Sequence, residues 1–193
     1  MADNKDNEER RNEFMDAAEK LFKENGIVDT TINSIVRELD VAKGLFYYYF
    51  KSKDDVIDAI SEKYNTVFKE MMNASMDHPR YEERLQQYME NCIHSFHTLN
   101  NQLKGKEDAD LSPLITRSMS EAKKAMERGM TRLLEEGNRT GYFQLEHPEY
   151  YAKILTGGII TLVREEADEK EIERIMEDLL NRLRKENRNE TEE

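Results

Sequence analysis

Apolar residues recur at three- and four-residue spacing along most of the chain, which is the pattern of helices with one buried face. Phe14, Ala18 and Leu21 show this spacing near the N-terminus, and Ile172 and Leu179 belong to it near the C-terminus. No stretch alternates apolar and polar residues in the way that predicts a strand. The pattern therefore predicts an all-α protein with about nine helices.

Glycine, proline and clustered polar residues mark the breaks between these helices. Gly26 is expected to end the first helix as a C-terminal cap, and Asp40 is expected in a turn because it tolerates a left-handed backbone. The expected helices cover residues 8–25, about 31–39, 42–48, 52–75, 81–102, 111–117, 120–138, 148–166 and 168–186.

The composition fits a helical protein with a core of its own. The 193 residues are 37% hydrophobic and 36% charged, and the longest apolar runs are too short to span a bilayer. Residues 1–6 lack the apolar core of a signal peptide, and the single cysteine excludes an intrachain disulfide. Both features predict a cytoplasmic protein.

The segment from Lys43 to Lys53 is the most informative in the chain. Five aromatic residues follow one another directly from Phe46 to Phe50, with Lys43 before them and Lys51 after them. A short helix, a tight turn and a second short helix that opens with lysine are the parts of a helix-turn-helix, whose second helix enters the major groove. An ordinary hydrophobic core with a solvated edge is the alternative, and it fits Phe46 and Phe50 best.

The net charge of −12 opposes DNA binding at first sight, but the position of the charges matters more than their sum. From Arg37 to Lys53 the chain has four basic residues (Arg37, Lys43, Lys51, Lys53) and two acidic ones (Glu38, Asp40), a local charge of +2. A small basic surface on an acidic protein is compatible with these numbers.

The motif Lys-Gly-x-x-Tyr-Tyr-x-Phe-Lys-Ser-Lys at residues 43–53, preceded by Gly26 and a Thr-Thr-Ile entry, resembles that of TetR-type (tetracycline-repressor-type) regulators. The resemblance implies a helix-turn-helix DNA-binding domain over residues 1–53 and an effector-binding and dimerisation domain over residues 54–193. It also implies a homodimer on a pseudo-palindromic operator in double-stranded DNA. The implied role is transcriptional repression that a small apolar effector relieves.

The resemblance also implies roles for single residues. Thr31 and Lys53 match phosphate contacts, at the starts of the second and fourth helices. Lys43 and Gly44 match positions that read bases, and lysine can donate to guanine O6 and N7.

Tyr47 and Tyr48 match aromatic residues that contact the DNA backbone and thymine methyls. The chain departs from the family pattern at Leu45, Tyr49 and Asp40, where a small hydroxyl residue, histidine and glycine are usual. Leu45 could touch a thymine methyl. These departures leave the operator sequence open, and Leu45 and Tyr49 stay among the expected DNA-binding residues.

Methionines and aromatic residues are frequent between residues 64 and 130, and thioethers adapt to varied apolar shapes. An ordinary core is the alternative for each of them alone. With the resemblance, the set predicts an effector pocket lined by Phe68, Met89, Cys92, Phe96 and Met126.

The last two helices carry regular apolar stripes. Close approach of helices would explain the glycines at 157 and 158, although a kink is the alternative. The expected dimer interface comprises Ile159, Ile172, Ile175, Leu179 and Leu183.

Other chemistry has weaker support. Glu90, His94 and His97 share a helix face, but one helix supplies at most three ligands, so no metal site is expected. Cys92 fits packing better than redox sensing. Neither a nucleophile motif nor a phosphate loop occurs, so we expect neither enzyme activity nor a cofactor. The remaining alternative is an all-helical dimeric interaction protein that has lost specific DNA binding.

Overall fold

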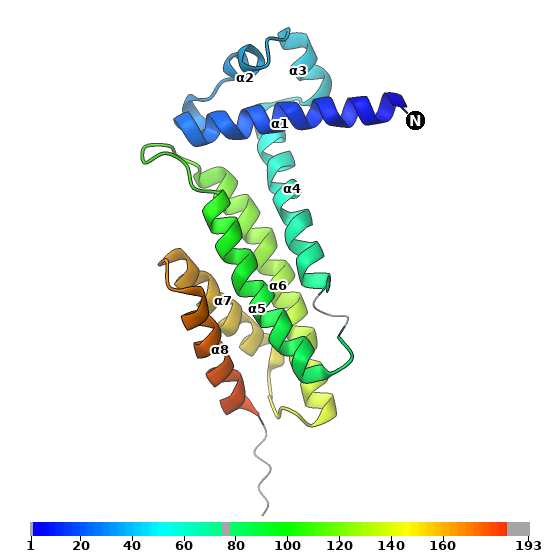
Figure 1. The fold of residues 1–193 in the computed structure, drawn as a ribbon, viewed down its shortest axis with the longest axis vertical. Coiled ribbons are helices and arrows are strands. Elements are labelled where there is room, and N and C mark those ends of the chain that lie inside the picture. The colour runs from blue at the N-terminus through cyan, green and yellow to red at the C-terminus, as the bar shows by residue number, and fades with distance from the viewer. Residues whose placement is uncertain (1, 75–77, 185–193) are drawn as a thin grey trace, which may run out of the picture. The chain divides into compact units, whose positions relative to one another are not determined.

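The structure is a computed structural model that describes residues 2–74 and 78–184. Side chains are described for residues 6–73 and 78–184. Within these ranges the chain is all-helical, as the sequence predicts, and has no strand (Figure 1). The helices are α1 (Ala2–Asp29), α2 (Ile32–Glu38), α3 (Lys43–Tyr49), α4 (Lys53–Ala74), α5 (Tyr81–Gln102), α6 (Ser112–Thr140), α7 (Pro148–Arg164) and α8 (Glu169–Leu183).

There are eight helices in the described ranges and not the expected nine because two expected helices are one. The two helices expected over residues 111–117 and 120–138 form the single helix α6. Pro113 does not interrupt it, because proline in the first turn removes an N–H that has no helical partner. The Asp110 carboxylate accepts a hydrogen bond from the backbone N–H of Ser112 at 2.9 Å, which satisfies one free donor at this helix start.

Helix α1 begins at Ala2, earlier than expected, and Gly26 breaks its helical geometry as the sequence predicts. Gly26 has a φ of +81°, which residues with a side chain rarely adopt. Its neighbour Ile27 donates its backbone N–H to the carbonyl of Asp110 at 2.9 Å. The glycine therefore redirects the chain toward α2.

The helices belong to two compact units. The first comprises Met1–Val67 and Asn101–Glu121, and the second comprises Phe68–Asn100 and Ala122–Glu193. This division follows packing, and the expected domain boundary after residue 53 stays a prediction. No helix in the described ranges is long and apolar enough to cross a membrane.

The first unit has an aromatic core beneath α2 and α3. The rings of Phe14 on α1 and Phe46 on α3 meet edge to face at 5.9 Å, and Phe22, Ile35 and Phe50 are buried around them. Edge-to-face ring pairs stabilise a core beyond their buried area. This packing fixes α3 against α1 and leaves the opposite face of α3 to solvent (Figure 1).

The second unit buries the apolar stripes that the sequence predicts. On α5 the buried residues are Leu85, Tyr88, Met89, Cys92, Ile93, Ser95, Phe96 and Leu99. Helices α7 and α8 lie side by side (Figure 1), and the inner face of α8 carries Ile172, Met176 and Leu180. The Asp168 carboxylate caps α8 by accepting from the backbone N–H groups of Lys170 and Glu171.

Candidate nucleic-acid interface and effector site

The helix-turn-helix is set by local hydrogen bonds. Thr31 caps α2: its hydroxyl accepts from the N–H of Ser34 at 3.0 Å, and the Ser34 hydroxyl accepts from the N–H of Thr31 at 3.0 Å. This reciprocal capping box satisfies two free donors at the helix start. Asp40 takes a left-handed φ of +51° in the turn, as expected. The role of Ser34 was not anticipated, although the Thr-x-x-Ser spacing indicates it.

Helix α3 presents one face to solvent. Phe46 is buried, whereas Tyr47 and Tyr48 are 50% and 69% exposed. Lys43 and Gly44 are also exposed, and the Lys43 ammonium lies 5.9 Å from the centre of the Tyr47 ring. Lysine ammonium and tyrosine hydroxyl groups can bind the phosphates of a nucleic acid, and exposed side chains in a groove can also contact base edges.

Gly44 leaves open space on this face. A methyl group built on Gly44 would meet no other atom within 4 Å, so the fold does not require glycine there. Close approach to another molecule is a reason for glycine on such a surface.

Leu45 and Tyr49 lie elsewhere on α3. Both are partly buried, and the Tyr49 ring centre lies 5.7 Å from that of Phe14 on α1. Leu45, Tyr48 and Tyr49 line an open groove of about 810 Å³ along the N-terminal part of α1. Leu45 and Tyr49 thus lie beside α1 in a groove that Tyr48 also lines, and their DNA contacts stay a prediction.

Lys53 makes contacts that the sequence did not indicate. Its ammonium donates to the carbonyls of Ile27 at 2.5 Å, Thr30 at 2.7 Å and Val28 at 3.3 Å. An ammonium has three donors, and these three bonds reach two carbonyls in the last turn of α1 and the carbonyl of Thr30, just after it. A phosphate contact by Lys53 requires the exchange of at least one of these bonds, and it stays a prediction.

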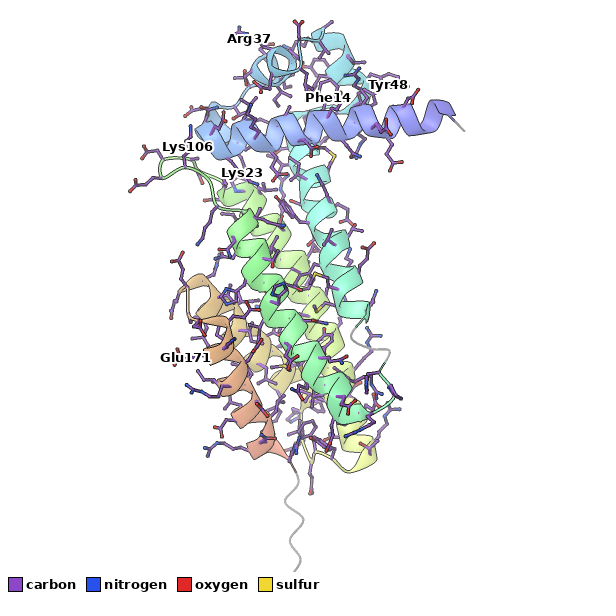
Figure 2. The ribbon with its side chains drawn as sticks, viewed as in Figure 1. Phe14, Lys23, Arg37, Tyr48, Lys106 and Glu171 are labelled. Carbon is purple, nitrogen blue, oxygen red and sulfur yellow. The ribbon has the colours of Figure 1, made fainter. Side chains whose placement is uncertain are left out.

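Two further basic residues that contribute to the local charge are exposed in the first unit. Arg37 lies on α2 (Figure 2), and Lys51 is the second residue after the end of α3. Neither residue is among the expected site residues.

The five expected effector residues are all buried in the second unit, and their role as one site stays a prediction. They are Phe68, Met89, Cys92, Phe96 and Met126, and the rings of Phe68 and Phe96 meet at 5.1 Å. Burial raises the pKa of the Cys92 thiol well above its usual value. The thiol therefore stays protonated at neutral pH, which disfavours redox chemistry.

Met89 alone among these five lines a cavity of about 450 Å³ between α5 and α8. Leu85, Ile93 and Leu180 form its apolar floor, and charged side chains form its rim. A smaller depression of about 200 Å³ lies between α4, α5 and α6, where Met72 and Tyr88 line it.

The helix face that carries His94, where no metal site is expected, makes a contact with α8. His94 Nδ1 lies 2.9 Å from a carboxylate oxygen of Glu169. In the part of the chain that the structure describes, no group of three or more His, Cys, Asp or Glu residues could hold a metal ion.

The five expected interface residues divide into two sets. Ile159 and Ile172 are fully buried within the single chain, so their side chains pack inside the subunit. Ile175 and Leu179 are about 40% exposed, and Leu183 is partly exposed. The interface itself stays a prediction.

The chain matches the family model "Bacterial regulatory proteins, tetR family" over residues 14–60. It is 52% identical over 50 residues to the HTH-type transcriptional regulator HbdR of Aromatoleum sp. (strain CIB), covering 26% of this chain and 22% of HbdR. It is 30% identical over 101 residues to the HTH-type transcriptional regulator YuxN of Bacillus subtilis (strain 168), covering 50% of this chain and 35% of YuxN. The matches thus span about a fifth to a third of these relatives.

Solved structures match along most of the chain. A TetR/AcrR-family regulator from Thermobifida fusca has a TM-score of 0.68 at 26% identity, with 89% of this chain and 96% of that chain covered. The SmeT–triclosan complex has a TM-score of 0.69 at 21% identity, with 92% of both chains covered. At that identity the second likeness concerns the fold alone.

Proposed function

We propose that this chain, which belongs to the TetR family of bacterial regulatory proteins, is a homodimeric transcriptional repressor that a small apolar effector releases from DNA. The observation that carries the proposal is the exposed face of α3, which follows the turn after α2. This face carries Lys43, Gly44, Tyr47 and Tyr48. The operator is double-stranded and pseudo-palindromic, and the protein works in the cytoplasm. No catalytic step belongs to this function.

Base reading falls to the start of α3. Lys43 donates to guanine O6 or N7, and Gly44 allows the backbone to come close to the groove. Tyr47 and Tyr48 contact the sugar-phosphate backbone and thymine methyls, while Thr31 offers a hydroxyl to phosphate.

The exposed apolar side chains of α7 and α8 support the homodimer. Ile154 is 70% exposed and Tyr150, Ile175 and Leu179 are also exposed, on two neighbouring helices. Burying such apolar surface contributes a free energy of about 25 cal/mol per Å² and so favours association. A two-fold dimer places two α3 helices one DNA turn apart, about 34–36 Å.

The effector binds among Phe68, Met89, Cys92, Phe96 and Met126. Flexible thioethers can shift to admit an apolar ligand into this core. SmeT, a protein of the same fold, has been solved with triclosan, which supports a ligand role for this domain. Helix α4 carries Lys53 in its first turn and Met72 in its last, so displacement of its far end can disturb DNA contacts. The ligand must bind the DNA-incompetent state more tightly.

Selection of bound sequences from a random DNA library, followed by titration at several salt concentrations, tests DNA binding. We expect palindromic sites and an affinity that falls steeply with salt, because each phosphate contact releases a counterion. Recovery of asymmetric sites, or of none, supports the alternative of a dimeric interaction protein without specific DNA binding.

A further inference from the structure

All the charged side chains that line the small depression in the second unit are positive. Its eight lining residues come from α4, α5 and α6 and include three cations and no acid; they are Lys69, Met72, Asn73, Tyr88, Ala125, Arg128, Gly129 and Arg132. In a chain of net charge −12, a local cluster of three positive charges needs a physical reason.

Two of these cations stand one helical turn apart. Arg128 and Arg132 are exposed on α6 at i, i+4 spacing, where like charges destabilise a helix by about 0.2–0.5 kcal/mol. Glu136, the acid one turn beyond Arg132, pairs with Arg84 instead. Neither Arg128 nor Arg132 has an ion-pair partner within residues 6–73 and 78–184. Their charges are therefore available to a ligand.

Tyr88 forms the floor of the depression. It is 1% exposed, and its hydroxyl donates to the carbonyl of Met126 at 3.0 Å. Burial raises the pKa of the Tyr88 hydroxyl, whereas the positive charges of the nearby Arg132 and Arg128 act to lower this pKa. Both cations therefore interact electrostatically with the hydroxyl.

Gly129 makes room for this floor. A Cβ at Gly129 would lie 2.1 Å from the Tyr88 hydroxyl oxygen, so a side chain there would displace the ring. Glycine inside a helix costs about 1 kcal/mol relative to alanine. The chain thus combines a weak helix former with two like charges at the same place.

The depression adjoins the buried sulfur and aromatic core. Met72, which lines it, has its Sδ 3.2 Å from the Cys92 Sγ, and Tyr88 bonds to the backbone of Met126. Cys92 and Met126 belong to the expected effector site. A ligand in the depression therefore meets the cations of α4 and α6 and also Met72 and Tyr88, which contact the buried core.

We infer that the effector is an organic anion whose charged group binds Arg128 and Arg132 and whose apolar part points toward Met72 and Tyr88. Arginine binds carboxylates through paired, charge-assisted hydrogen bonds. The cavity of about 200 Å³ is smaller than the usual 300–1,000 Å³ of drug-sized ligands, which favours a small carboxylate. This inference rests on the proposed function and adds a charge requirement to it.

Three probes of equal chain length test the charge requirement: octanoate, 1-octanol and octylamine. Calorimetric titration of the full-length protein should show octanoate binding about tenfold more tightly than 1-octanol, or about 1.4 kcal/mol, with octylamine the weakest. The double variant Arg128→Gln, Arg132→Gln should lose this order. Arg139→Gln, at an exposed arginine in the last turn of the same helix, is the matched control and should keep it.

Equal affinity for the three probes, or an order that survives in the double variant, would overturn the inference. Release of the selected DNA site is measured separately, with the same probes. Octanoate that binds at the arginines but leaves the DNA complex intact would refute the effector role. A protein that binds no DNA at all would refute the proposed function, while the titration still decides the anion site.

Discussion

The ammonium of Lys53 donates to the carbonyl of Thr30 at 2.7 Å, directly before the residue that caps α2. Thr30 itself is buried, and its hydroxyl donates to the carbonyl of Gly26 at 2.7 Å. Through these bonds Lys53, at the start of α4, holds the connection from which α2 begins. A residue expected to bind phosphate thus also positions the helix-turn-helix.

Replacement of Lys53 by alanine should lower both stability and DNA affinity. Three carbonyls lose a charged donor, which should cost about 1–3 kcal/mol of unfolding free energy. Binding should weaken by a similar factor for all DNA sequences, because the lysine contacts no base. Thermal unfolding and library selection measure the two effects. Lys51→Ala, at an exposed neighbouring lysine, should leave stability unchanged; a changed sequence preference in Lys53→Ala would contradict the assigned role.

Replacement of Lys43 by alanine should change which sequences bind. Lys43 is exposed at the start of α3, so stability should change by less than about 0.5 kcal/mol. Loss of a base contact should reduce discrimination by about 1–3 kcal/mol at one position of each half-site. Selection with wild type and variant side by side measures this change. An identical preference would remove Lys43 from base reading.

Replacement of Gly44 by alanine separates folding from binding. An added methyl meets nothing within 4 Å, and alanine is the better helix former by about 1 kcal/mol, so the melting temperature should not fall. DNA affinity should fall on the order of tenfold if the backbone approaches the groove here. Fluorescence anisotropy with a labelled operator measures the affinity. An unchanged affinity would show that the start of α3 does not approach the DNA groove closely.

Replacement of Leu179 by glutamate should yield a soluble monomer. Leu179 is 40% exposed within the subunit, so the subunit itself can tolerate a charge there. In a dimer, each buried leucine contributes about 1.5–3 kcal/mol per chain, and the glutamate would be buried without a partner. Sedimentation equilibrium measures the mass. Glu177→Ala, at an exposed position on another face of α8, is the control, and a stable Leu179→Glu dimer would place the interface elsewhere.

The sequence by itself determined the helices and their buried faces. The span expected over residues 81–102 is α5, because its apolar period and flanking breaks are local signals. Gly26 and Asp40 adopt the positive φ values that their types allow, and the Lys43–Tyr48 segment forms a short helix with an exposed face. The sequence did not indicate that α6 is one helix, because proline is common both in the first turn of a helix and just after the end of one.

Only the tertiary structure decided which neighbour covers each face. Ile172 and Leu179 belong to one periodic stripe, yet Ile172 is buried inside the subunit and Leu179 is partly exposed. The Lys53 bonds to carbonyls 23 to 26 residues away, and the cationic depression formed by three helices, have no local signal. Periodicity states which residues share a helix face, whereas the packing of distant segments determines what that face contacts.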